Sequence, residues 1–231
     1  MIDLIVFSKN RAMQLDCLLR SLDEYTDPIF RKKVIYTFTT SDKRFERGYE
    51  LLKKLHPNVQ FIKEENLKAN ILSNMNSYLT CMMVDDQIMF KQCPHIPMLK
   101  ENQCFSLRLG GNISEPHISY PMSIDGHVFR TEDIKPLIES ISFNNPNILE
   151  KKLQRFKKGW DILWKEQVMV SIPCNRVSDK SHCAYTGEYT EHTLTEFFLR
   201  GSEIDYHKMN FKNLNNVHAD IRYAFRLRET N

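Results

Sequence analysis

The sequence predicts an α/β fold in which a mostly parallel central sheet is flanked by helices. Within the first 90 residues, short apolar runs alternate with segments whose apolar residues recur at helical spacing. That alternation is typical of parallel strands joined by crossover helices. The chain has 231 residues, of which 42% are hydrophobic and 26% are charged, as in ordinary globular proteins. Because no repeat or linker interrupts the pattern, we expect one domain over residues 1–231.

The elements of the first part follow one another regularly. An apolar, β-branched or aromatic composition predicts strands at residues 2–7, 34–39, 59–62 and 78–84. Helical spacing of apolar side chains predicts helices at residues 12–25, 45–56 and 66–76. The second of these helices stops before Pro57, which cannot continue a helix. The first part therefore has the order β-α-β-α-β-α-β.

The pattern is less regular in the second part. Strands are expected at residues 104–109, 128–130 and 168–172, and helices at 132–141, 147–166 and 193–200. The helix over 147–166 would be the longest, with Trp160 and Trp164 on its apolar stripe and lysines on the opposite face. That basic face is most simply a solvated surface, although it could also contact an anionic membrane surface peripherally.

Composition excludes several classes of protein. Glycine accounts for only 7 residues, and neither a phosphate-binding P-loop nor a G-x-G-x-x-G dinucleotide motif is present. A net charge of +3 is too small to indicate a nucleic-acid partner, so none is expected. No apolar run reaches the roughly 18 residues that span a bilayer. Six widely spaced cysteines favour reduced thiols, and with them a cytoplasmic location.

Polar side chains follow three of the predicted parallel strands. They are Ser8 to Arg11, Thr39 to Asp42, and the pair Asp85-Asp86. Ligands of open α/β sheets bind at this edge, where the carboxyl ends of the strands meet. Two adjacent carboxylates repel each other, and Mg²⁺ or Mn²⁺, or hydrogen bonds to a ribose, would relieve the repulsion. The alternative is an acidic turn that caps the next segment.

Five segments, taken in order, resemble nucleotide-sugar glycosyltransferases of the GT-A fold, in particular family-2-like enzymes. They are LIVFSKNRAMQLDCLLRSL at residues 4–22, MMVDDQIMF at 82–90, CFSLRLGGN at 104–112, DGHVFRTEDI at 125–134 and FNNPNILE at 143–150. The resemblance extends from residue 2 to about residue 220. It implies a Rossmann-like GT-A domain with a nucleotide-sugar half over about 1–112 and an acceptor half over about 113–231. It also implies transfer of a hexose from a nucleoside-diphosphate sugar, a UDP-sugar first of all, to a hydroxyl of a glycan, glycolipid or glycoprotein.

The resemblance also implies roles for the residues at the strand ends. Ser8 and Arg11 match the loop that contacts the nucleoside and the diphosphate. Thr39 and Asp42 would lie near the base. Asp85 would face the ribose.

The metal site implied by the resemblance is centred on the segment Asp85-Asp86-Gln87. Asp86 would bind Mn²⁺ or Mg²⁺ with Gln87 and with His218, which resembles a late histidine of such sites. The third position of the family's D-x-D segment is Gln87 here and not an acid. Because an amide oxygen is a weaker, neutral ligand, strict dependence on the metal is in question. Otherwise His218 is a surface histidine.

An inverting enzyme of this fold needs one general base for the acceptor hydroxyl. Glu150, near the start of a predicted helix, is the first candidate, and the helix N-terminus is expected to lower its pKa. Asp133, with Glu132, is a second candidate, and Asp125 is expected to contact a sugar hydroxyl. Each could instead be an ordinary carboxylate at a helix start or turn.

Two other functions are compatible with the same residues. A sugar-nucleotide nucleotidyltransferase is one, although such enzymes carry a glycine-rich loop after the first strand and Ser8 to Arg11 contains no glycine. The other is a module that binds a nucleotide or carbohydrate without catalysis. Release of nucleotide from a sugar nucleotide would distinguish a transferase from both.

Overall fold

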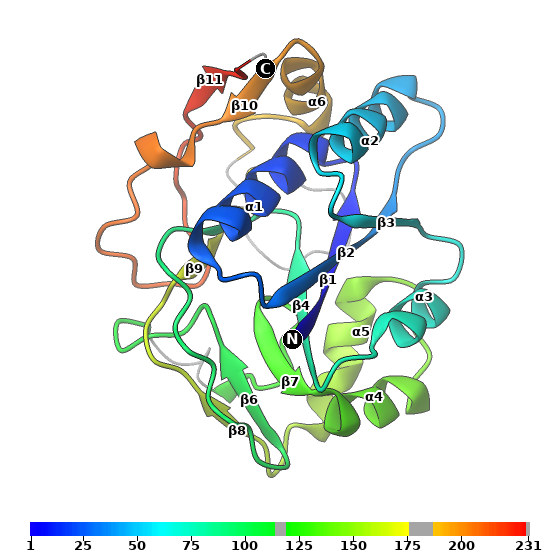
Figure 1. The fold of residues 1–231 in the computed structure, drawn as a ribbon, viewed down its shortest axis with the longest axis vertical. Helices are drawn as coiled ribbons and strands as arrows, with labels where there is room; N and C mark the ends of the chain where they lie inside the picture. The colour runs from blue at the N-terminus through cyan, green and yellow to red at the C-terminus, as the bar shows by residue number, and fades with distance from the viewer. Residues whose placement is uncertain (114–118, 176–186, 230–231) are drawn as a thin grey trace.

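A seven-stranded sheet forms the centre of the protein, with the strand order β3-β2-β1-β4-β7-β6-β8 (Figure 1). The computed structural model describes residues 1–113, 119–175 and 187–229. The strands are β1 (Ile2–Lys9), β2 (Phe30–Thr37), β3 (Gln60–Lys63), β4 (Leu79–Val84), β6 (Gln103–Ser106), β7 (His127–Arg130) and β8 (Asp161–Leu163). Strands β1 to β4 pair in parallel, whereas β7 is antiparallel to both of its neighbours. The predicted α/β fold with a mostly parallel sheet is confirmed.

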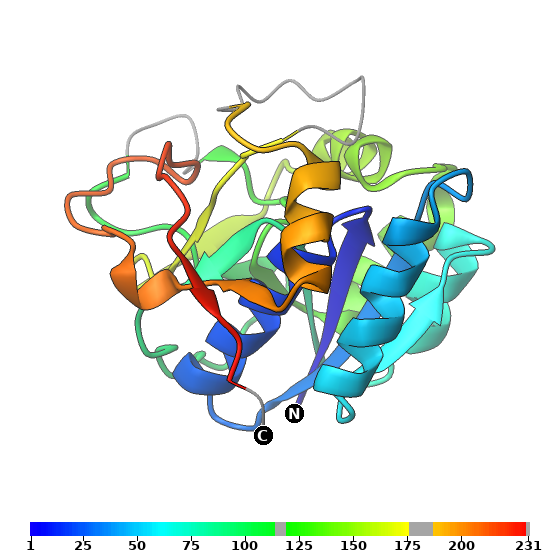
Figure 2. The same cartoon turned by 90° about the horizontal axis from the view of Figure 1, so that it is seen from above.

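Helices cover both faces of this sheet, as the alternating pattern predicts (Figures 1 and 2). They are α1 (Ala12–Tyr25), α2 (Lys43–Leu55), α3 (Leu67–Asn74), α4 (Thr131–Ser140), α5 (Pro146–Leu153) and α6 (Glu191–Leu199). Helix α1 packs with α2 and α6 over one face, and α3 and α4 pack together over the other with α5. Met13, Leu15 and Leu18 of α1 are fully buried, which is why this helix matches its predicted bounds.

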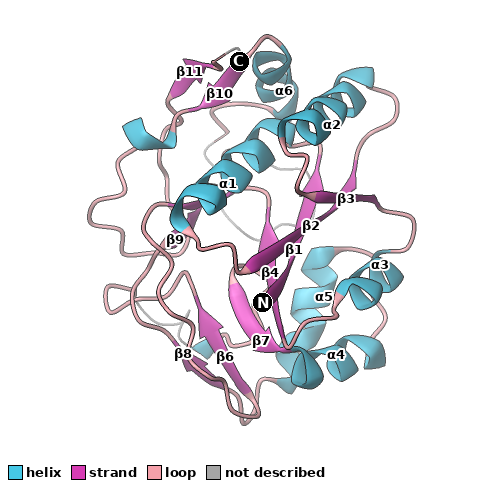
Figure 3. Ribbon diagram, viewed as in Figure 1, coloured by secondary structure: helices cyan, strands magenta, loops and turns pink. Residues whose placement is uncertain are grey.

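Four short strands that the sequence did not reveal complete the structure. They are β5 (Gln87–Met89), β10 (Ser202–Ile204), β11 (Phe225–Leu227) and β8, whose residues were expected to be helical. β5 pairs with β9 (Met169–Ser171), which lies within the strand predicted at residues 168–172, and β10 pairs with β11 beside α6 (Figure 3). Ser171 also bridges to His218. These pairings bring the C-terminal part of the chain to the end of β4, where Asp85 and Asp86 lie.

The prediction of one long helix over residues 147–166 is wrong. Helix α5 ends at Leu153, a single 3-10 turn follows at Gln154–Phe156, and residues 161–163 form β8. Gly159 has a φ of +85°, a conformation that ends a helix and that glycine adopts without strain. Trp160 packs edge-on against Phe129, with the ring centroids 5.8 Å apart, and does not lie on a helical stripe.

Two further sequence observations can be followed in the described part of the chain. Its five cysteines are free thiols, and Cys183 lies outside the described residues. None of the described helices combines the length and the apolar character needed to cross a membrane.

Candidate functional site

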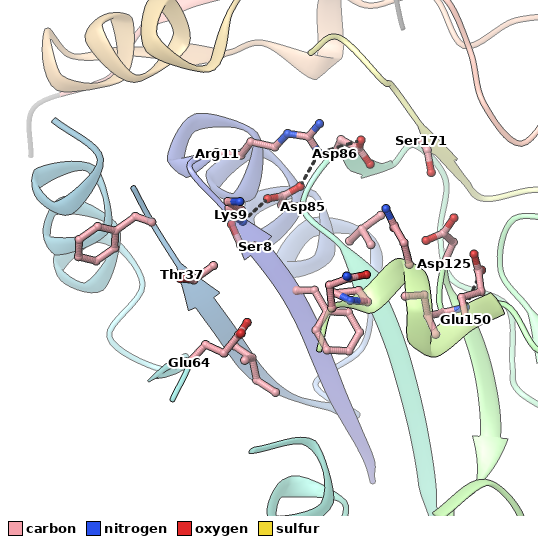
Figure 4. A pocket seen from close by; sticks show the side chains of 18 of the residues that line it. Ser8, Lys9, Arg11, Thr37, Glu64, Asp85, Asp86, Asp125, Glu150 and Ser171 are labelled. Carbon is pink, nitrogen blue, oxygen red and sulfur yellow. Dashed lines mark hydrogen bonds and ion pairs between the residues drawn. The ribbon is translucent and has the colours of Figure 1, made fainter. Parts of the chain in front are cut away.

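A cavity of about 730 Å³ opens at the carboxyl ends of β1, β2 and β4 (Figure 4). Phe7 of β1 is level with Ile35 of β2 and Val84 of β4, so the residues that follow these strands reach one edge together. Of the predicted site residues, those that line the cavity are Ser8, Arg11, Thr39, Asp85, Asp86, Asp125, Glu150 and His218. The structure therefore brings together residues that are up to 210 positions apart in the sequence.

Arg11 organises the wall formed by the ends of β1 and β4. It precedes α1, and its Nη1 donates to Asp85 Oδ1 at 2.9 Å and to Asp86 Oδ2 at 3.1 Å. Its Nε donates to Asn175 Oδ1 at 2.8 Å. Burial by itself lowers the pKa of Arg11, but the charges of Asp85 and Asp86 raise it above the ordinary value. Arg11 is thus a permanent cation, fixed between two buried acids.

Asp85 and Asp86 differ in how completely their oxygens are hydrogen-bonded. Asp85 Oδ2 accepts from the backbone N–H of Lys9 at 3.1 Å, so both of its oxygens have donors. Asp86 Oδ1 is buried and has no hydrogen-bond partner among the residues that the structure describes. Burial, together with the charges of Asp85 and Asp125, raises the pKa of Asp86 to about 7 against the opposing effect of Arg11. Asp86 thus lines the cavity and contains one buried oxygen to which no described residue donates.

Asp125 and Glu150 form the opposite wall (Figure 4). Arg108 Nη1 donates to Asp125 Oδ2 at 2.8 Å. Glu150 Oε1 accepts from Ser123 Oγ at 2.9 Å and from the backbone N–H of Ile124 at 3.1 Å. This wall is formed by residues 123–125, which lead into β7, and by Glu150 of α5.

Gly126 fixes the direction in which the chain leaves this wall. Its φ is +78°, and a Cβ at this position would lie 1.9 Å from Met169 Cε. Only glycine fits there without a shift of the core. Its N–H donates to the carbonyl of Met82, which anchors the turn containing Asp125 against β4.

The expected lowering of the Glu150 pKa is wrong. Burial, with the charge of Asp125 added, raises the pKa of Glu150 to about 7, although Arg108 and the hydrogen bond from Ser123 oppose the shift. Helix α5 begins at Pro146, so Glu150 lies beyond its first turn, where the helix dipole is weak. Desolvation therefore exceeds the effect of the helix N-terminus.

An asparagine ties the end of β1 to the end of β2. Asn10 has a φ of 59°, in the left-handed region that asparagine tolerates. Its side chain donates to Thr39 Oγ1 at 2.9 Å and accepts from the backbone N–H of Thr39 at 2.8 Å. Ser8 Oγ lies 2.7 Å from Tyr49 Oη. This loop is thus ordered by side chains in a chain that has few glycines.

Three predicted site residues lie outside the cavity lining. Asp42 caps α2, accepts from the backbone N–H of Arg44 at 2.9 Å, and pairs with the Arg44 side chain. Asp133 lies in the first turn of α4 and accepts from the backbone N–H of Asn102 at 3.3 Å. Gln87 is fully buried, and its Oε1 accepts from the backbone N–H of Val84 at 3.1 Å. The place of Asp133 is the helix start given above as the alternative, whereas the contacts of Asp42 and Gln87 were not anticipated.

The donor atoms that could hold a divalent cation are few. Within the described ranges, no three His, Cys, Asp or Glu side chains gather closely enough to hold a metal ion. Asp86 Oδ1 is nevertheless a buried oxygen without a donor, and His218 lines the same cavity. Mg²⁺ and Mn²⁺ commonly take one or two protein ligands and complete their shell with substrate phosphates and water. The residues therefore fit a cation that is shared with a diphosphate.

Sequence reasoning missed two residues that line the cavity, Asn175 and Glu64, and one that supports its wall, Arg108. Asn175, which holds Arg11, is 164 residues away from it, and no local pattern links the two. Arg108 lies in an apolar segment, and a buried arginine there is a signal that could have been used. Glu64 follows the third strand in the same way that Asp85 follows the fourth, so the strand-end argument could have found it.

Comparison with known proteins gives one curated relative and several solved structures. No family model matches the chain. An alignment of 98 positions, which covers 38% of this chain, is 34% identical to the bifunctional glycosyltransferase pgtA of Dictyostelium discoideum. The match spans only 13% of the length of that relative.

The solved structures are more distant. A mannosyltransferase of Pyrobaculum calidifontis, solved with GDP-Man and Mn²⁺, is 12% identical, with a TM-score of 0.48 over 72% of this chain and 55% of that one. The galactosyltransferase LgtC is 10% identical, with a TM-score of 0.47 over 70% and 72%. A nucleotidyl transferase from Methanothermobacter is 10% identical, with a TM-score of 0.44 over 72% and 87%. At these scores none of them bears on activity, and the curated match is a likeness of 38% of this chain to a small part of a glycosyltransferase.

Proposed function

We propose that this protein is a glycosyltransferase that moves a sugar from a nucleoside diphosphate to a hydroxyl of a sugar acceptor. The observation that carries the proposal is the cavity itself, which has a cation and acids on one wall and a second pair of acids on the other. Such a transfer needs a site for a leaving diphosphate and a base for the attacking hydroxyl. The two walls supply one each.

The wall containing Arg11 suits the diphosphate. Its guanidinium is fixed by Asp85, Asp86 and Asn175, so it needs no reorganisation when negative charge develops on the leaving group. Asp86 and His218 would hold a divalent cation together with the diphosphate. That cation, when bound, supplies Lewis-acid stabilisation of the leaving group.

The opposite wall suits proton transfer. Glu150 Oε1 is anchored by Ser123 and Ile124, whereas Oε2 has no hydrogen bond within the described residues. A carboxylate whose pKa is about 7 is a stronger proton acceptor than an ordinary glutamate and is still half-ionised at neutral pH. Asp125, oriented by Arg108, is placed to accept from a hydroxyl of the sugar.

The proposed reaction is a single displacement with inversion. The acceptor hydroxyl oxygen forms a bond to the anomeric carbon while the bond from that carbon to the diphosphate oxygen breaks. The electron pair of the broken bond leaves with the diphosphate, opposite Arg11. The hydroxyl proton passes to Glu150 Oε2, and no oxidant or reductant is needed.

The test is release of nucleoside diphosphate from UDP-, GDP- and TDP-sugars in the presence of Mn²⁺. We expect release from at least one sugar nucleotide, and a fall of about 100-fold or more in Asp86→Asn, which remains folded. Asp161→Asn makes the same chemical change on exposed β8 and serves as the matched control. Pyrophosphate exchange without release would instead indicate a nucleotidyltransferase. Binding without release would indicate a non-catalytic module, and either result contradicts the proposal.

A further inference from the structure

One acidic side chain of the cavity belongs to neither wall. Glu64 follows β3, and its backbone N–H donates to the carbonyl of Tyr36 at 2.8 Å, which continues the β2–β3 pairing by one residue. The pairing with β2 therefore fixes the backbone position of Glu64. Figure 4 shows Glu64 and Thr37 on the β2 side of the cavity, with Asp125 and Glu150 on the other side.

Within the described residues, the Glu64 carboxylate has no hydrogen-bond or ion-pair partner that would explain its place at the cavity. In the described part of the chain, no hydrogen bond or ion pair is made by its carboxylate, and the nearest compensating charge is that of Lys9. Its partial burial raises its pKa above the ordinary value despite Lys9. A half-buried carboxylate at a cavity, without a donor, is stabilised by a ligand that brings donors of its own.

The strand order gives the separation across the sheet between Glu64 and Asp85, which is on the wall proposed for the diphosphate. Glu64 follows β3 and Asp85 follows β4, and three strand spacings separate these strands through β2 and β1. At about 4.8 Å per spacing, the two positions are about 14 Å apart across the sheet. A base, a ribose and two phosphates in series can span this length. With the diphosphate at Arg11, the base reaches the end of β2 and β3.

The neighbours of Glu64 also suit a base. Phe38 lines the cavity, and its ring stacks on Tyr36 at a centroid distance of 6.3 Å, with Lys63 Nζ 5.0 Å from the ring centroid. Thr37 and Thr40 line the same end and can donate or accept hydrogen bonds. Lys9 also lines the cavity, and Lys63 Nζ lies over the Phe38 ring, but these two cations can only donate hydrogen bonds. Among the described residues at this end, Glu64 is therefore the charged group that can accept them.

We propose that Glu64 selects guanine as the base of the nucleotide donor, so that this protein takes a GDP-sugar; the inference rests on the proposed function. Guanine presents N1–H and the N2 amino group side by side, and these two donors match the two oxygens of a carboxylate. Uracil presents one N3–H between two carbonyl oxygens, which a carboxylate repels. Adenine and cytosine each place one amino donor next to a ring acceptor. The UDP-sugar expected from the resemblance is therefore disfavoured at this position.

The experiment is calorimetric titration of the full chain with GDP, UDP, ADP and CDP at pH 8 in the presence of Mn²⁺. We expect GDP to bind about tenfold more tightly than UDP, or better, because hydrogen bonds to a charged group contribute about that much. Glu64→Gln should lose this preference, with GDP weakened about tenfold and UDP unchanged or tightened. Glu65→Gln removes the charge of the exposed neighbour and should keep the preference.

Three results would overturn the inference. Equal binding of GDP and UDP by the wild type shows that Glu64 does not choose the base. Equal weakening of all four nucleotides in Glu64→Gln assigns Glu64 to the ribose. In both cases the proposed function stands. Failure of all four nucleotides to bind overturns the proposed function and the choice of base together.

Discussion

The two walls of the cavity each contain one carboxyl whose pKa is raised to about 7, Asp86 on one wall and Glu150 on the other. Asp86 is buried and Glu150 is partly buried, each lies near a second acid, and an arginine pairs with that acid. The difference lies in what holds them. Asp86 is paired directly with Arg11, whereas Glu150 is held by two neutral donors from the turn at Ser123.

This difference separates a site that binds charge from a site that moves a proton. At Asp86 an oxygen without a donor among the described residues lies beside Asp85 and the single cation Arg11, so this wall suits a divalent cation that is shared with a diphosphate. At Glu150 no cation pairs with the carboxyl directly, and its ionised and protonated forms are close in free energy near neutral pH. Two acids with the same shifted pKa can therefore have different roles.

Replacing Arg11 on one wall and Arg108 on the other tests the difference between the two walls, and it has the largest expected effect. Arg11→Met leaves Asp85 and Asp86 buried without their cation, and it also removes the contact to Asn175. We expect the free energy of unfolding to fall by about 3–5 kcal/mol, measured by denaturant titration. Arg108→Met removes a cation from Asp125 alone and should cost less. An equal or smaller cost for Arg11→Met would contradict the difference between the walls.

The pH dependence of stability tests whether both carboxyls are shifted. The pKa of each is higher in the folded protein than in the unfolded chain, so the folded state holds more protons between about pH 4 and pH 7. The stability from these groups is complete at low pH and is lost as the pH rises through 7. Asp86→Asn and Glu150→Gln should each gain stability relative to the wild type from pH 5 to pH 8. A difference that does not change with pH would show that the group is not shifted.

A smaller effect tests how α5 positions the second wall. Asn145 caps α5 by accepting from the backbone N–H of Ile148 at 2.9 Å, and Asn66 caps α3 in the same way, accepting from Ala69 at 3.0 Å. Asn145→Ala and Asn66→Ala should each lower the free energy of unfolding by about 1 kcal/mol. Only Asn145→Ala should also slow nucleotide release by a few-fold. Equal slowing in both variants would remove the link between α5 and the site.

The sequence was sufficient to predict the parallel strands β1 to β4 and the helices between them, because the signals for these elements are local. Helix α1 has its predicted bounds, and β1 to β4 lie where apolar runs placed them. The error over residues 147–166 has a physical cause, since apolar spacing continued past Gly159, where the chain turns into β8. At the site, the strand-end rule found Arg11, Asp85 and Asp86. The rule could not show how they are compensated, because that depends on distant partners such as Asn175.

The electrostatics of the second wall were also beyond a local pattern. The raised pKa of Glu150 arises from burial and from Asp125, which is 25 residues away in the chain and is brought close by the fold. The position of Glu150 near the start of a predicted helix had indicated a lowered pKa, which is the opposite direction. Burial is a property of the assembled structure, so the sign could be decided only there.

The pH dependence of turnover in the wild type and in Glu150→Gln is the most direct test of the central claim, that Glu150 receives the acceptor proton. The account predicts that wild-type turnover rises with pH and levels off, with a midpoint at about 7. Glu150→Gln should turn over about 100-fold more slowly or worse, without that rise and with unchanged affinity for nucleoside diphosphate. Glu139→Gln, an exposed change on α4, should behave as the wild type. Retention of the rise at pH 7 in Glu150→Gln, at an unreduced rate, would contradict the claim.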